Sequence, residues 1–205
     1  MIAFKTMIKR IINWVVPVRG RGNIVRGINL RKVQIVGNNN IIKCAATNIG
    51  SVKIRIFGNN NNKIIISENV IMKSGLLWIE DNGNEIEILE NTTIEGAELA
   101  VAEGCKILIG KDCMFSSDIR IATTDSHSII DMSTGERTNR AKDVVIEDHV
   151  WLGKGVSVNK GVVIKEGTII SGNSVVTKSC ETNCVYAGIP ATLKKQNVSW
   201  SRKRI

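Results

Sequence analysis

The first third of the chain lacks acidic residues. All 19 Asp and Glu lie from Glu68 onward, whereas 12 of the 28 Lys and Arg precede that residue, in a chain of 205 residues with net charge +9. An asymmetry of this kind is typical of proteins with an anionic partner, such as a lipid headgroup, a nucleic acid or an acidic polymer. It also fits a surface that is merely soluble, so charge alone leaves both readings open.

Aromatic residues and prolines are scarce. Aromatic residues make up 4% of the sequence, and there are 2 prolines against 18 glycines. This composition suits tight corners around an aliphatic interior. The cysteines are odd in number and lack zinc-ribbon spacing, so we expect reduced, structural thiols in a cytosolic protein. They are Cys44, Cys105, Cys113, Cys180 and Cys184.

Against these absences stands one strict repeat. From Ile146 to Glu181 the chain reads as six consecutive hexads with an aliphatic first position and a small or β-branched fifth position. A period of six fits neither a helix nor a hairpin strand, but it fits short strands that each end in a sharp bend. The pattern predicts an all-β parallel β-helix, triangular in section, with the first positions inward: Ile146, Leu152, Val158, Ile164, Ile170 and Val176.

Looser hexads extend this β-helix toward the N-terminus. From about residue 33, aliphatic segments alternate with asparagine-rich corners at 37–40, 58–62 and 82–84, and the implied coils are longer than three hexads. Asn and Gly tolerate left-handed backbone, so these runs predict stacked turns rather than a ligand site. We therefore expect one β-helix domain over residues 33–190, followed by a basic tail over 191–205 whose last segment, VSWSRKRI, is mobile.

Residues 1–32 are predicted to be a basic amphipathic helix with its lead-in. Apolar side chains share one stripe of residues 2–16, with Lys and Arg opposite, and Pro17 and Gly20 end the helix. The stripe is too short and too charged to span a bilayer, and no signal-peptide cleavage site follows. The helix either caps the open end of the solenoid or lies on a membrane surface.

One segment breaks the repeat. Strict phase holds from Ile109, yet the next hexad would begin at His127, and the phase returns only at Ile146. The polar, aperiodic stretch 127–145 is predicted to be an excursion loop, and such loops commonly carry function.

Together with ISGNSVVTK and AGIPA further on, the hexads and the histidine-bearing loop resemble the hexapeptide-repeat acyltransferases. The resemblance is densest from Ile109 to Lys195 and points to the bacterial polysaccharide and sialic acid O-acetyltransferases. It implies a left-handed β-helix, acetyl-coenzyme A (acetyl-CoA) as co-substrate, no metal, and a homotrimer with active sites in the clefts between subunits.

The resemblance also implies roles for individual residues. His127 would be the catalytic base, because imidazole titrates near neutral pH, and Asp125 could orient it, as could a backbone carbonyl. DHVWLG resembles the family's DNVWIG, so Trp151 would stack on a sugar or on the pantetheine arm, or serve an interface. His149 replaces the usual Asn, and its role stays open between an acid–base group, an acceptor-binding donor and an interface residue. The implied acetyl-CoA contacts are Gly153, Gly172, Thr177, Lys178, Pro190 and Lys195.

The function expected from this resemblance is O-acetylation of a bacterial surface saccharide of capsular, polysialic or lipopolysaccharide type. The acceptor would be anionic or lipid-linked and the enzyme cytoplasmic, with a peripheral contact at the inner membrane where the helix lies on it; no nucleic-acid partner is expected. An N-acetyltransferase of an amino sugar is the alternative. The zinc carbonic anhydrases of this fold need three histidine ligands, whereas this chain has 2 histidines. A non-catalytic solenoid does not account for the histidine loop together with VVTK.

Overall fold

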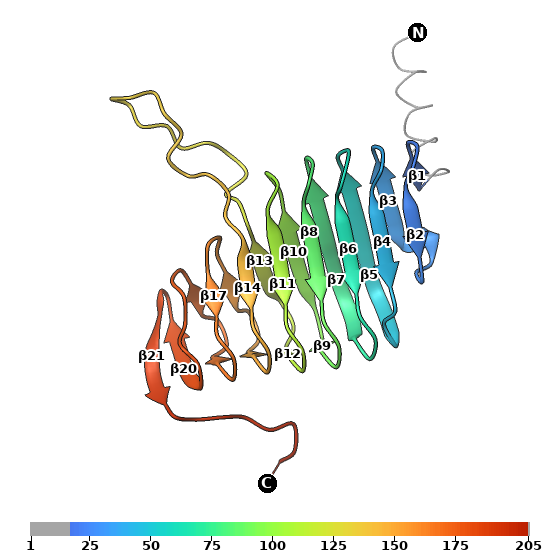
Figure 1. Ribbon diagram of the computed structural model, residues 1–205. Coiled ribbons are helices and arrows are strands. Elements are labelled where there is room, and N and C mark those ends of the chain that lie inside the picture. Colours follow the sequence, from blue (N-terminus) through green and yellow to red (C-terminus); the bar gives the residue numbers. More distant parts are fainter. Residues whose placement is uncertain (1–16, 205) are drawn as a thin grey trace.

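The computed structural model describes residues 17–204, which form a parallel β-solenoid (Figure 1). Each coil lays one strand on each of three faces, and strands stack in parallel register from coil to coil. The first face is a seven-stranded sheet. Its strands are β2 (Ile24–Arg26), β4 (Ile41–Cys44), β6 (Lys63–Ile66), β8 (Glu85–Ile88), β11 (Lys106–Ile109), β14 (Val144–Ile146) and β17 (Val163–Ile164).

The second and third faces are joined into one sheet by two long strands that bend across their shared corner. These are β5 (Asn48–Phe57) and β7 (Ile71–Glu80). The second face continues through β9 (Thr93–Ile94), β12 (Met114–Phe115), β15 (Trp151–Leu152), β18 (Ile169–Ile170), β20 (Cys184–Gly188) and the antiparallel β21 (Ala191–Gln196). The third face contains β1 (Val18–Arg19), β3 (Val33–Val36), β10 (Ala97–Val101), β13 (Ile119–Ala122), β16 (Ser157–Val158) and β19 (Val175–Val176), and a 3-10 turn, Leu30–Lys32, precedes β3.

The hexad prediction is confirmed at every first position. The six predicted inward side chains are at most 2% exposed and belong to one continuous aliphatic core. The fifth positions are buried as well, from Val150 to Cys180. Three hexads make one coil here, so the first residue of every hexad returns to the core.

Longer coils toward the N-terminus are stabilised by an asparagine ladder. Asn40, Asn62 and Asn84 are fully buried at the corner between the third and first faces, at a spacing of 22 residues. Asn62 Nδ2 donates to Asn40 Oδ1 at 2.9 Å, and Asn84 Nδ2 donates to Asn62 Oδ1 at 3.2 Å. The asparagine corners are therefore stacked turns, as predicted. Each buried amide is satisfied by the next coil.

Both predicted ends of the domain need adjustment. Strand pairing begins before residue 33, since β1 pairs with β3 and β2 pairs with β4. The helix predicted over residues 2–16 lies outside the described residues. Within the basic tail, residues 191–196 form β21. The prediction that the last segment, VSWSRKRI, is mobile is wrong, because this segment runs back beneath the coils (Figure 1), where side chains of Trp200 and Arg202 bind it to the solenoid. Within residues 17–204, no helix is long and apolar enough to cross a membrane.

Candidate active site

The chain leaves the solenoid at the corner between the third and first faces. β13 ends at Ala122 and β14 begins at Val144, and the segment between them projects from the body as a long loop (Figure 1). A single antiparallel bridge between Ile130 and Arg137 joins its two arms. The loop stands where the hexad phase is interrupted.

An ion pair closes the base of this loop. Arg137 donates to Glu103 through two hydrogen bonds, Nη1 to Oε2 at 2.8 Å and Nη2 to Oε1 at 2.7 Å. The side chains are 21% and 27% exposed, respectively. The guanidinium lowers the pKa of Glu103 below its ordinary value. Because a bidentate pair is directional as well as strong, it fixes the returning arm of the loop against the preceding coil.

Asn139 connects the two arms. Its Nδ2 donates to Asp125 Oδ2 and to the backbone oxygen of His127, both at 2.8 Å, and its Oδ1 accepts from the backbone N–H of Ile129 at 2.7 Å. The residue is only 8% exposed. An amide can donate two hydrogen bonds and accept others at once, which neither a carboxylate nor an aliphatic side chain can do. Asn139 therefore sets the backbone path on both sides of His127.

The Asp125 carboxylate binds Lys160 and Asn139. Lys160 Nζ forms an ion pair with Asp125 and donates to the backbone oxygen of Asn139 at 2.9 Å. Hydrogen bonds from Lys160 first, and from Asn139 second, hold the pKa of Asp125 below its ordinary value. The Asp125 carboxylate thus helps to hold the base of the loop, together with Glu103, Arg137 and Asn139; we call these contacts the loop anchor. The role of Asp125 in orienting the His127 imidazole stays a prediction.

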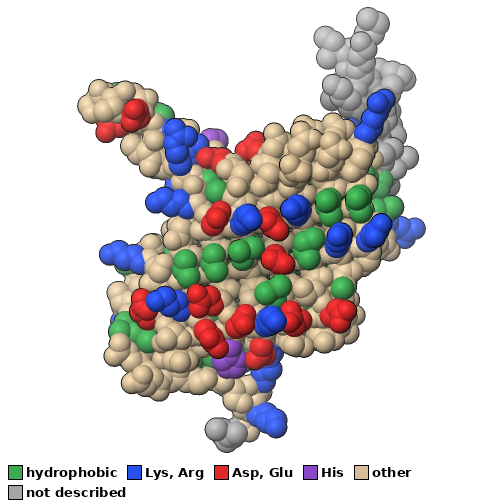
Figure 2. Space-filling view, in the orientation of Figure 1, with side chains coloured by type: hydrophobic (Ala, Val, Ile, Leu, Met, Phe, Trp, Pro, Cys, Tyr) green, Lys and Arg blue, Asp and Glu red, His purple; other side chains and the backbone are tan. Residues whose placement is uncertain are grey.

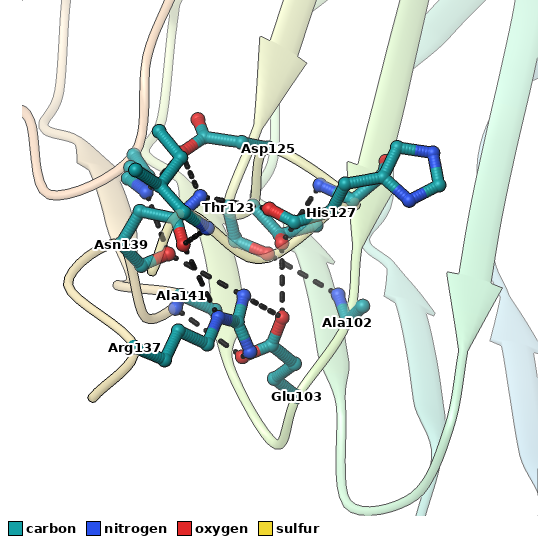
Figure 3. Close-up of polar contacts among 12 residues, drawn as sticks. Ala102, Glu103, Thr123, Asp125, His127, Arg137, Asn139 and Ala141 are labelled. Carbon is teal, nitrogen blue, oxygen red and sulfur yellow. Dashed lines mark hydrogen bonds and ion pairs between the residues drawn. The ribbon is translucent and has the colours of Figure 1, made fainter. Parts of the chain in front are cut away.

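His127 has a fixed backbone and an exposed ring. Its N–H donates to the Asp125 backbone oxygen at 2.8 Å, and its own carbonyl accepts from Asn139. The imidazole points away from the anchoring contacts (Figure 3), and within residues 17–204 no hydrogen bond reaches its nitrogens. Such a ring is free to take a proton from a bound acceptor.

The second histidine lies at a different corner, between the first and second faces. His149 Nδ1 lies 2.7 Å from Asp112 Oδ2, and Nε2 lies 3.2 Å from the backbone oxygen of Trp200. The Trp200 indole stacks on the imidazole, and its Nε1 donates to the His149 backbone oxygen at 2.8 Å. Arg202 donates to Asp112 Oδ1 at 2.9 Å. We call the contacts of Trp200 and Arg202 with His149 and Asp112 the tail clamp. These contacts lie within one chain and match none of the three roles left open, which stay predictions; in this structure His149 binds the chain's own tail.

The backbone at His149 is left-handed, with φ of 54°. Gly155, Gly161, Gly167 and Asn173 occupy the same place in the following hexads, also at positive φ. Asn and Gly adopt this conformation at little cost, whereas histidine is less suited to it. The departure from the family's Asn is therefore offset by the tail clamp that the imidazole makes possible.

Trp151 points outward from β15, as predicted, and is 37% exposed. Its ring lies beside Trp200, with centroids 6.2 Å apart. It lines a hollow of about 470 Å³ on the second face together with the cationic side chains of Lys73 and Arg202. The tail thus contributes directly to the surroundings of Trp151.

The glycines implied in cofactor binding meet at the corner between the second and third faces. A Cβ built on Gly153 would lie 2.6 Å from the backbone nitrogen of Gly172. Coil stacking alone therefore requires glycine at 153. Thr177 and Lys178 follow β19 and are exposed at the same corner as the loop base. Pro190 and Lys195 are exposed in the β20–β21 hairpin.

Sequence reasoning missed the residues that anchor the loop and the tail. Arg137 and Asn139 lie in the aperiodic loop, and Glu103 lies in a turn between two regular strands, so only the folded structure brings them together. Trp200 carried a usable signal, because a lone aromatic residue in a basic tail is expected to pack against something. It is 8% exposed.

Comparison with known proteins identifies the fold family. Residues 143–178 match the family model described as bacterial transferase hexapeptide (six repeats). A polysialic acid O-acetyltransferase of Neisseria meningitidis is 38% identical over 177 residues, which cover 85% of this chain and 81% of that protein. The chain belongs to the hexapeptide-repeat acyltransferases.

Two solved structures of this family resemble the whole solenoid. The polysialic acid O-acetyltransferase OatWY aligns with a TM-score of 0.81 and 34% identity, covering 93% of this chain and 86% of that one. The polysialic acid-specific acetyltransferase NeuO aligns with a TM-score of 0.68 and 28% identity, covering 90% and 87%. The similarity of this acyltransferase to OatWY and NeuO therefore includes the coils before and after the loop.

Proposed function

We propose that this acyltransferase transfers an acetyl group from acetyl-CoA to a hydroxyl of a bacterial surface saccharide of the polysialic type. Two relatives that align over most of both chains, at 38% and 34% identity, are named polysialic acid O-acetyltransferases. Lys and Arg side chains show on the surface of the first coils (Figure 2), and these basic residues complement an acidic polymer. The contact of residues 2–16 with a membrane stays a prediction, since they lie outside the described residues.

The observation that carries the proposal is the anchored loop base with its free imidazole. His127 takes the proton of the acceptor hydroxyl while the oxygen attacks the thioester carbonyl. The carbon–sulfur bond then breaks, coenzyme A leaves as a thiolate, and the proton returns to that sulfur. The anchor of Asn139, Arg137 and Glu103 fixes the position from which the ring acts. A positioned base of this kind contributes about 10²- to 10⁴-fold.

Direct transfer is favoured over an acyl-enzyme by the state of the cysteines. Burial raises the pKa of Cys113 and of Cys180 to about 12 each, and that of Cys105 to about 11. Thiols of this kind are protonated at neutral pH and are poor nucleophiles. An acyl-cysteine intermediate is therefore disfavoured at these three positions, which supports direct passage of the acetyl group from sulfur to the acceptor oxygen.

The positions of the candidate residues support a site shared between subunits. The His127 loop and Lys178 lie at the third–first corner, Gly153 and Gly172 at the second–third corner, and Trp151 on the second face. Corners of one triangular solenoid face away from each other. A neighbouring copy in a homotrimer would bring its Trp151 and glycine corner to the loop of the first, with Thr177, Lys178, Pro190 and Lys195 along the acetyl-CoA groove.

The test is transfer of labelled acetyl groups from acetyl-CoA to a panel that contains polysialic acid, neutral oligosaccharides and free amino sugars. We expect base-labile acetyl esters on polysialic acid. Base-stable amides on amino sugars would instead establish N-acetylation, and no transfer to any acceptor would reject the proposal.

Co-expression tests the shared site. We expect His127→Ala and Trp151→Ala to be strongly impaired alone, yet to regain part of the activity when both chains assemble together, because some interfaces then combine two intact halves. Absence of recovery in mixed trimers of confirmed composition would place both residues in the same chain's site.

A further inference from the structure

The third face carries a hollow beside the loop base that the assignments above do not use. Arg55, Trp78, Ala100 and Ala122 are neighbours in register across four successive coils. Arg55, Trp78 and Ala100 alternate with buried core positions, so their side chains belong to the outer surface of the face, whereas Ala122 is itself buried. The short side chains of Ala100 and Ala102 leave space beside the Trp78 indole. The resulting hollow has a volume of about 250 Å³.

The lining of this hollow has the chemistry of a sugar site. The Trp78 indole offers an apolar wall, Glu80 and Glu98 offer hydrogen-bond acceptors, and Arg120, next to Glu98 in register, offers a fork of donors. Pyranose rings present apolar C–H faces and a rim of hydroxyls. Aromatic walls with a few placed polar groups suit such rings, because the wall covers the C–H face while carboxylates accept from hydroxyls.

The Trp78 indole is held in place by its neighbours, and the hollow lies near His127, the proposed catalytic base. Phe57 packs on Trp78 with ring centroids 5.0 Å apart and planes at 44°, which limits movement of the indole. At its other end the hollow is lined by Thr124 and Ser126, and Ser126 directly precedes His127. A ring in the hollow would therefore lie beside the loop base.

Beyond the indole, the surface turns basic. Arg55 neighbours Trp78 in register, and Lys53 neighbours Leu76, another residue of the hollow. These cations lie toward the first coils, on the side away from Lys160 and Lys178. The carboxylate of an acidic sugar is disfavoured beside Glu80 and Glu98 but favoured beside Arg55 and Lys53.

From these contacts we propose that the hollow binds one sugar ring of the acceptor polymer, stacked on Trp78, while Arg55 and Lys53 bind the acid group of an adjoining residue. The proposal rests on the proposed function and adds to it a location for the acceptor. The acceptor would then lie on the side of the loop that faces the N-terminal coils, and acetyl-CoA would lie on the opposite side.

The experiment measures kinetics with polysialic acid and acetyl-CoA in four variants of the full chain. Trp78→Ala removes the wall and Ala100→Leu fills the hollow from an outward position. Trp78→Phe keeps an aromatic wall. Ile24→Ala, on the exposed edge of the first face, is the matched control.

We expect Trp78→Ala and Ala100→Leu to raise the KM for polysialic acid by about tenfold, a factor that corresponds to about 1.4 kcal/mol. The KM for acetyl-CoA should stay unchanged in both. Trp78→Phe should recover most of the affinity, and Ile24→Ala should match the parent. Unchanged KM for polysialic acid in Ala100→Leu, with a native thermal unfolding curve, would overturn the proposal.

A binding measurement separates this inference from the proposed function. Saturation-transfer NMR with a short sialic acid oligomer needs no catalysis, and we expect a signal in the parent that Ala100→Leu abolishes. If the parent transfers no acetyl group yet shows that signal, the proposed function fails and the hollow stands. If transfer proceeds and the signal is the same in both proteins, the hollow is not the acceptor site. Equal loss of trimer mass in Trp78→Ala and Ala100→Leu would assign the face to a second copy of this chain instead.

Discussion

Trp200 stacks on His149 across 51 residues of chain, with ring centroids 4.2 Å apart and planes 6° from parallel. Both nitrogens of the imidazole face acceptors, the Asp112 carboxylate and the Trp200 carbonyl. Burial would raise the pKa of Asp112, but the hydrogen bonds from His149 and Arg202 together lower it below its ordinary value. The tail clamp thus combines stacking with charge, and it fixes Trp200 beside Trp151.

Trp200→Ala should release the tail. It removes the stack, the hydrogen bond to the His149 backbone and most of the buried indole, which together contribute about 1–3 kcal/mol. We expect trypsin to cleave after Arg202 at a much higher rate while the solenoid resists. Ser199→Ala, at an exposed neighbour, is the control. Equal cleavage rates in parent and Trp200→Ala would show that the stack does not hold the tail.

Acid should loosen the loop before it unfolds the solenoid. In the folded state the pKa values of Glu103 and Asp125 are lowered by Arg137 and Lys160, so their contribution to stability is present above the unfolded values of 4.5 and 3.8. It is lost as pH falls through the lower folded values. Amide exchange of residues 127–139, corrected for intrinsic rates, should rise between about pH 5 and about pH 3. If the amides of the loop and of the solenoid core lost protection at the same pH, the loop would not be held by contacts separate from those of the solenoid.

Ile164→Asp should abolish soluble expression, because it buries an unpaired carboxylate at a position that is 0% exposed. The adjacent Val163, also on β17, faces outward and is partly exposed. Val163→Asp is therefore the matched control and should be expressed at close to the parent level. Equal yields of the two variants would contradict the inward phase of the hexads.

Lys178→Ala should weaken coenzyme A binding about three- to thirtyfold at low salt, as expected for loss of one lysine–phosphate contact, and less at high salt. The residue is exposed, so the fold should be unaffected. Lys194→Ala is an exposed control on β21. Calorimetric titration that gives one affinity for parent and Lys178→Ala would remove this lysine from the groove.

Much of the fold could be predicted from the sequence because the position of a residue within its hexad determines whether its side chain is buried. Leu152 or Ile170 needs no knowledge of distant residues to be placed inward, since the period alone sets its direction. The asparagine corners are equally local, because a left-handed backbone favours Asn and Gly wherever it occurs.

The contacts of the site could not be predicted in the same way. Asn139 is one of many polar residues in an aperiodic loop, and its importance appears only when Asp125, His127 and Ile129 surround its amide. Likewise, nothing near Trp200 in the chain indicates that His149 is its partner. Such pairings depend on how a loop or tail closes over large separations in sequence, which local pattern does not encode.

In the proposed mechanism, His127 removes the proton of the acceptor hydroxyl. The most direct test of this step is the single-turnover rate of acetyl transfer in His127→Ala, at saturating acceptor and acetyl-CoA. We expect a loss of about two to four powers of ten with acetyl-CoA affinity retained, and a smaller loss in His149→Ala, whose ring binds the tail. A full rate in His127→Ala would contradict the general-base mechanism, and an exchange of the two phenotypes would assign the base to His149.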